Sequence, residues 1–129
     1  MPAENLWIVE NRVMLTRLTG HITIEDMAVS ARKGTALIES GTAPVYSLVD
    51  ASQIEHFPLK LNELKTVSEQ GSSDKLAWII IYGIPNRLLS FLATTFVQVI
   101  GKRYKVVASQ DEALAFVAQQ EGHTLIPNL

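Results

Sequence analysis

The chain has 129 residues, of which 47% are hydrophobic and 19% are charged, with a net charge of −2 and no cysteine. This length fits one domain that buries roughly two-thirds of its unfolded surface, so the fold needs no disulfide or structural metal. The lack of cysteine excludes disulfide scaffolds, thiolate zinc sites and cysteine nucleophiles. The near balance of acidic and basic residues excludes the electrostatic footprint of a nucleic-acid-binding protein.

The first third of the chain predicts a β-hairpin followed by a helix. An apolar run at 6–9 and an alternating pattern at 12–18 flank a polar turn, which is typical of two antiparallel strands. A helix is expected from Thr23, whose hydroxyl can cap it, to Gly41, which can end it. Gly34 lies within this helix, where it would allow close packing against a sheet.

The rest of the chain alternates strands with helices. Three apolar runs predict strands: 45–50, 76–82 and 105–108. Three segments with helical spacing or caps predict helices: 61–70, 86–100 and 110–120, the last with a capping box of Ser109 and Glu112. The segment 51–58 is expected to be a loop. The order ββαβαβαβα predicts one α/β domain over residues 1–129, with a mixed sheet of about five strands and about four helices.

The segment 76–101 is the most hydrophobic part of the chain, and Arg87 is its only charged residue. Its length would match a membrane span. However, Gly83 and Pro85 divide it into a β-branched run and a separate helical pattern. At the N-terminus, Glu4 is acidic, whereas a secretory signal would be basic there. We therefore expect no membrane span and a cytoplasmic protein.

Five short motifs follow one another along nearly the whole chain: Trp7-Ile8-Val9, Gly20 to Asp26, Val45 to Ser52, Phe57-Pro58 and Ser109 to Phe116. Together with the element order, they resemble the STAS family (sulfate transporter and anti-sigma-factor antagonist), and most closely its SpoIIAA-like branch of small stand-alone bacterial proteins. The resemblance implies a STAS/SpoIIAA-like sandwich fold. It also implies a regulatory module that binds proteins and is not an enzyme.

The resemblance further implies a phosphorylation switch in related proteins. In that family, a serine or threonine near the start of the helix after the central strand is phosphorylated, and the added charge alters partner docking. In this chain, Phe57-Pro58-Leu59-Lys60 stands at that place without any hydroxyl, and Ser52 matches the end of the strand motif. The expected phosphoacceptor is therefore missing. The branch is also likened to lipid-carrying CRAL-TRIO domains, so the alternative function is a carrier or sensor of a small apolar ligand bound between helices and sheet.

Ligands of open α/β sheets bind beyond the carboxyl ends of the parallel strands. In this chain those ends are predicted at 50–52, 83–87 and 108–109, where helix N-termini could also receive an anion. The alternative is that Asp50 and Ser52 form only local hydrogen bonds and that Arg87 is a solvated residue in the first turn of a helix.

The predicted helix 86–100 has a thin polar stripe and no charged residue between Arg87 and Lys102. A surface helix ordinarily has a wide charged face. One side of this helix is therefore expected to cover the sheet. The other would contact a protein partner, a second copy of the chain or an apolar ligand, unless neighbouring segments bury it. The candidate surface combines both regions: Asp50, Ser52, His56, Phe57, Lys60, Asn86, Arg87, Ser90, Phe91, Thr94 and Gln98.

Catalytic and metal chemistry receive little support from the sequence. Glu55 and His56 are types that perform acid–base work, but no triad accompanies them, and the three histidines lack the spacing of metal ligands. No catalytic residue, metal or cofactor is therefore expected. The basic residues Lys102, Arg103 and Lys105 are interpreted as favourable charges near a helix C-terminus.

Overall fold

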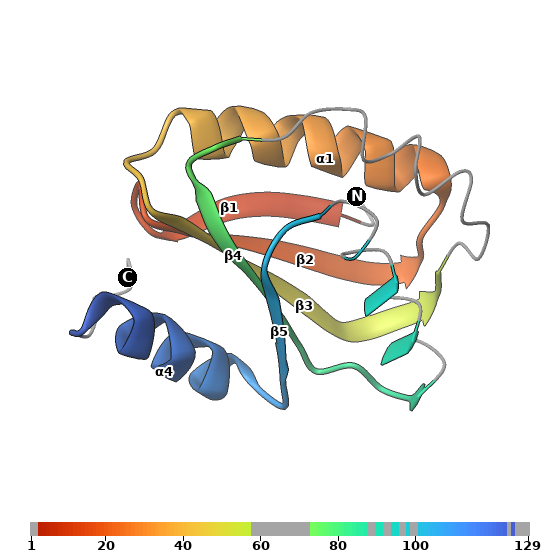
Figure 1. The fold of residues 1–129 in the computed structure, drawn as a ribbon. Coiled ribbons are helices and arrows are strands. Elements are labelled where there is room, and N and C mark those ends of the chain that lie inside the picture. Colours follow the sequence, from red (N-terminus) through yellow and green to blue (C-terminus); the bar gives the residue numbers. More distant parts are fainter. Residues whose placement is uncertain are drawn as a thin grey trace.

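The structure is a computed structural model that describes residues 3–57, 73–87, 90–91, 94–95, 98, 101–123 and 125. Within these residues five strands form one sheet in the order β1-β2-β3-β4-β5 (Figure 1): Ala3–Val9, Val13–His21, Val45–His56, Leu76–Tyr82 and Tyr104–Val107. β1 and β2 are antiparallel, and β2 to β5 are parallel. The predicted α/β class and the mixed five-stranded sheet are therefore confirmed.

The strands β2 and β3 are longer than the sequence pattern predicts. Their parallel pairing continues to the partners His21 and His56, past register shifts that follow Arg17 and Gly20. The predicted loop over 51–58 is therefore wrong for residues 51–56. The physical reason is that Ala51 and Ile54 are buried in the core and hold this polar segment in the sheet.

Two helices have defined bounds. α1 (Ile24–Glu39) begins with a capping box, because the Thr23 hydroxyl accepts a hydrogen bond from the Asp26 amide and the Asp26 carboxylate accepts one from the Thr23 amide. α4 (Gln110–Glu121) begins with Ser109, whose hydroxyl accepts from the Glu112 amide at 3.2 Å. In the predicted capping box, the Glu112 carboxylate would also accept a hydrogen bond from the Ser109 amide. It accepts instead from the Ala108 amide.

The predicted count of four helices does not fit the residues that the structure describes. The expected helix over 61–70 and the candidate residue Lys60 lie outside them. Within the expected helix 86–100, the described residues are helical from Arg87 onward: Arg87, Ser90, Phe91, Thr94, Thr95 and Gln98.

The helices α1 and α4 lie on opposite faces of the sheet (Figure 1). α1 packs over β1 and β2. Gly34 faces the sheet there, because an added Cβ would lie 3.3 Å from Asn5 Nδ2 and 3.4 Å from Met14 Cε. The predicted packing role of Gly34 is therefore confirmed. α4 packs against β3 and β4 through Ala113 and Val117, which are almost fully buried.

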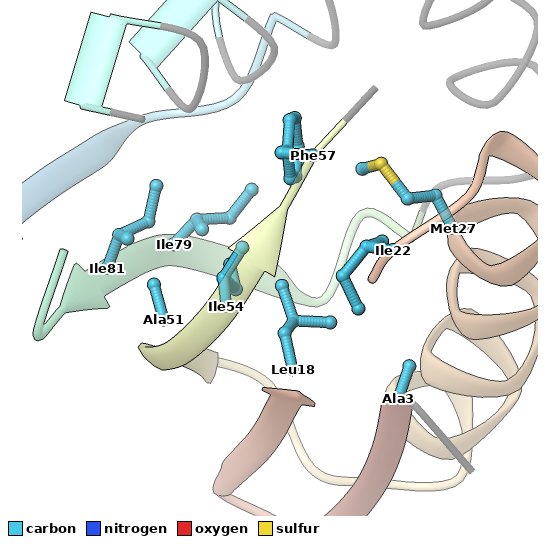
Figure 2. Packing of buried hydrophobic residues seen from close by; sticks show 9 residues of the cluster. All are labelled: Ala3, Leu18, Ile22, Met27, Ala51, Ile54, Phe57, Ile79 and Ile81. Carbon is cyan, nitrogen blue, oxygen red and sulfur yellow. The ribbon is translucent and has the colours of Figure 1, made fainter. Parts of the chain in front are cut away.

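Each face of the sheet has its own apolar core. On the α1 face, Met27 of the helix packs with residues from four strands and from the segments around them (Figure 2): Ala3, Leu18, Ile22, Ala51, Ile54, Phe57, Ile79 and Ile81. On the α4 face, Leu15, Leu48 and Ile80 are register partners on three neighbouring strands and are at most 2% exposed. β4 is apolar along its length because both of its faces are covered.

A polar cluster attaches the end of α4 to the sheet. The Tyr46 hydroxyl donates to Glu121 Oε2 at 2.7 Å, and the Arg12 guanidinium pairs with the other oxygen of the same carboxylate. Burial raises the pKa of Tyr46 to about 12, with the hydrogen bond and charge of Glu121 adding to the effect. Burial alone would raise the pKa of Glu121. The hydrogen bonds from Tyr46 and Arg12 and the charge of Arg12 outweigh this and lower that pKa.

We expect Glu121→Gln to lower the free energy of unfolding by about 1–3 kcal/mol at pH 7, because the charge-assisted hydrogen bonds are lost. The pKa of Glu121 is lower in the folded than in the unfolded protein. The contribution of ionised Glu121 to the free energy of unfolding is therefore complete above the unfolded-state pKa. This contribution is lost as the pH falls through the folded-state pKa. Urea unfolding at pH 7 and at about pH 3 measures the difference between the two proteins, which should shrink in acid.

Glu10→Gln is the matched control, since Glu10 is exposed in the turn between β1 and β2. Its effect should stay within about 0.5 kcal/mol at both pH values. A difference between wild type and Glu121→Gln that is equally large at both pH values would contradict this account.

Candidate functional site

Two residues of the predicted surface, Asp50 and Phe57, lie on opposite faces of the sheet. Asp50 belongs to the α4 face, because its carboxylate hydrogen-bonds with Tyr82 of that core. Phe57 is 8% exposed and packs in the core of the α1 face (Figure 2). Asn86 and Arg87 lie beyond the end of β4. The structure therefore separates Phe57 from Asp50, whereas Ser52 lies against the segment that leads from Gly83 to Asn86.

A row of polar side chains crosses four strands on the α4 face. Glu4, Arg17, Asp50 and Tyr82 are successive register partners on β1, β2, β3 and β4. Because register partners point to the same face, their side chains lie side by side. Arg17 Nη1 donates to Glu4 Oε1 at 2.9 Å, and both side chains are about half exposed. Next to them, Tyr82 is only 6% exposed.

The pKa of Tyr82 is raised to about 12, mainly by burial of the phenol. The negative charge of Asp50 and its hydrogen bond also raise this pKa, and the charge of Arg17 lowers it. Tyr82 is therefore protonated at neutral pH and donates toward Asp50. The Asp50 carboxylate also accepts from the Ser52 amide at 2.9 Å and from the Ser52 hydroxyl at 2.6 Å. Asp50 and Ser52 thus form the local hydrogen bonds that were the alternative to a ligand site.

The chain after β4 passes directly over Ser52. Gly83 has a φ of 74°, and an added Cβ would lie 2.9 Å from Ser52 Cβ. A residue with a side chain would be strained by both the backbone angle and the contact. Gly83 therefore fixes the direction in which the chain leaves the sheet toward Asn86.

An open hollow of about 420 Å³ lies where this segment meets the carboxyl ends of β4 and β5. Its wall combines apolar and polar residues: Gly83, Ile84, Asn86, Arg87, Ser90, Val106, Val107 and Ala108. This is the end of the sheet at which open α/β folds bind ligands. Of the predicted strand ends, 83–87 contributes four residues to this wall and 108–109 contributes Ala108. The predicted end at 50–52 is wrong, because β3 continues to His56.

The described helical residues beside the hollow expose apolar surface. Phe91 is 66% exposed. The hydroxyls of Thr94 and Thr95 both donate to the Phe91 carbonyl, at 3.0 and 2.8 Å, and Thr94 also donates to the Ser90 carbonyl. Both hydroxyls of the polar stripe therefore donate within their own helix. Gln98 reaches the sheet, since its Nε2 donates to the Tyr104 hydroxyl at 3.3 Å.

The structure also brings together two side chains that sequence reasoning left apart. His21 and His56 are register partners at the ends of β2 and β3, and their rings are stacked with centroids 4.9 Å apart. To predict this contact from the sequence, one would have to extend the pairing of the two strands through their polar ends, up to His21 and His56. Among the described residues, no three His, Cys, Asp or Glu side chains are grouped so that they could hold a metal ion.

No model of a known protein family and no curated protein matches the chain. No helix that the described residues form has the length and apolarity to cross a membrane. The STAS resemblance stays a prediction, and function is inferred from the geometry of the chain itself.

We expect Asp50→Asn to lower the pKa of Tyr82, because the variant removes the negative charge that opposes formation of the phenolate. The pKa should stay above the ordinary value of about 10, since burial of the ring is unchanged. A pH titration followed by NMR of ¹³C-labelled tyrosine measures this shift. Tyr46 is the internal control, because its carboxylate partner is Glu121. An unchanged Tyr82 titration would show that Asp50 does not act on the phenol.

Proposed function

We propose that this protein is a non-enzymatic interaction module that docks another protein chain through the helical surface around Phe91. The observation that carries the proposal is the 66% exposure of this aromatic ring. Single exposed apolar residues are common on protein surfaces. Phe91, however, lies in a stretch without a charged residue from 88 to 101, and interface cores are depleted of charge and enriched in aromatic residues.

The hydrogen bonding of the same helix supports this docking role. The hydroxyls of Thr94 and Thr95 bond to carbonyls of their own helix, so a partner covering them would not need to supply new acceptors. Desolvating such a surface therefore costs less than desolvating a typical polar helix. The surface is suited to a mostly apolar protein contact.

A second copy of the chain is the partner that this surface fits best. In a contact around a two-fold axis, the same patch meets itself, and like charges near the axis would repel. The described residues of this stretch carry no charge and so avoid this repulsion: Ser90, Phe91, Thr94, Thr95 and Gln98. The proposed assembly is a homodimer in which the two Phe91 rings lie near the symmetry axis.

The chemistry of the polar row supports a binding role over a catalytic one. Tyr82 stays protonated at neutral pH because its pKa is about 12, so it cannot serve as a base. Asp50 is occupied as an acceptor for Ser52 and Tyr82. Both groups are therefore engaged with each other and with Ser52, which is an arrangement typical of a structural polar cluster.

We expect the wild-type protein to self-associate in sedimentation-velocity runs over a concentration series, and Phe91→Ser to weaken this association at least about tenfold. The exposed position makes the variant's own stability change small, within about 0.5 kcal/mol. Leu6→Ser is the matched control, because Leu6 is a partly exposed apolar residue on β1 and should leave the association unchanged. A wild-type protein that stays monomeric throughout, or equal effects of both variants, would contradict the homodimer.

The hollow beside the helix favours a second candidate function, the carriage or sensing of a small apolar ligand. Its volume of about 420 Å³ lies within the range of ligand pockets, and Ile84, Val106 and Val107 supply apolar wall. Native mass spectrometry of protein purified from its own cells distinguishes the two functions. A monomer with a co-purified lipid that Val106→Glu removes would support the carrier, whereas a ligand-free dimer would support docking.

A further inference from the structure

The two histidines at the ends of β2 and β3 lie side by side. His21 and His56 are directly opposite each other in the parallel ladder. Their ring centroids are 4.9 Å apart, and the ring planes differ by only 9°. Both residues are exposed, so an ion in solution can reach them.

The backbone beneath the two rings is held firmly. The Ile22 amide donates to the His56 carbonyl at 2.9 Å, which ties the end of β3 to the segment after β2. The residues that follow the two histidines, Ile22 and Phe57, are 1% and 8% exposed and pack with Met27 in the core (Figure 2). The two imidazoles themselves are exposed, so they lie outside that core.

The proximity of the rings suits chelation by imidazole nitrogens. Two nitrogens bound to one ion at about 2 Å each lie roughly 3 Å apart when they occupy adjacent coordination positions. Chelation requires the stacked rings to turn about their side-chain bonds until one nitrogen of each faces the same ion, and both rings are exposed to solvent. The backbone already holds the two ligands on one face, so little ordering is needed on binding.

We propose that His21 and His56 form a two-imidazole binding site for a divalent transition-metal ion. Imidazole pairs suit Cu²⁺, Ni²⁺ and Zn²⁺, and Cu²⁺ binds most tightly in the general order of affinities. Tetragonal coordination accepts two adjacent nitrogens and fills its other positions with water. The described residues add no third ligand, so the ion would keep open positions for water or for a donor group of another molecule.

The site goes beyond the docking function proposed above, because it lies at the ends of β2 and β3 and does not include Phe91. It also differs from the expectation drawn from the sequence, in which the spacing of the histidines along the chain favoured no metal site. Although His21 and His56 are far apart in the sequence, the parallel register of β2 and β3 places them next to each other.

The test is isothermal titration of the full chain, produced without a polyhistidine tag, with Cu²⁺ and separately with Ni²⁺ at neutral pH. We expect one ion per chain at the pair, with His21→Asn and His56→Asn each weakening binding at least tenfold. His123→Asn is the matched control, because His123 lies beyond the end of α4 and should leave the affinity unchanged. Circular dichroism checks that each variant is folded.

Amide NMR spectra locate the ion independently of affinity. Substoichiometric Cu²⁺, which is paramagnetic, should broaden the signals of residues next to His21 and His56 before any others. The proposal is overturned if the wild type and the two single variants bind equally, if His123→Asn removes the binding, or if broadening centres elsewhere. Weak binding that needs only one of the two histidines would likewise reject the chelate.

Discussion

The pairing of β2 with β3 supports most of the molecule. These two strands are the longest in the sheet and remain paired up to His21 and His56. They contribute side chains to the core on both faces, as Leu15 and Leu48 do toward α4 and Leu18 and Ile54 do toward the opposite side. Because both helices with defined bounds pack on a sheet built around this pair, the position of every described site depends on its register.

The features that could be predicted from the sequence are those set by neighbouring residues. The strand Leu76–Tyr82 was recognisable because both of its faces are covered and its run is continuously apolar. The starts of α1 and α4 were recognisable because Thr23 and Ser109 cap them locally. Such features depend on neighbouring residues alone, so they can be read without knowledge of the fold.

Features that depend on pairing between distant segments were missed. The end of β3 has the polar composition of a loop, and only its contact with β2 and the burial of Ile54 keep it in the sheet. A register shift changes the face of the sheet to which the following side chains point, such as that of Phe57. The positions of these shifts cannot be predicted from the sequence pattern. For this reason the candidate surface was predicted as one region, although its residues occur on both faces and at the end of the sheet.

The ion pair between Arg12 and Glu121 joins residues that are 109 positions apart in the chain. During synthesis on a ribosome, the hairpin that carries Arg12 emerges well before the carboxylate that completes its ion pair. Contacts of such long sequence separation form late, because the loop between them must first be closed. Until α4 docks, the apolar row of Leu15, Leu48 and Ile80 has no cover from that helix. From the emergence of β4 until α4 docks, this apolar face of the sheet is therefore not covered by α4.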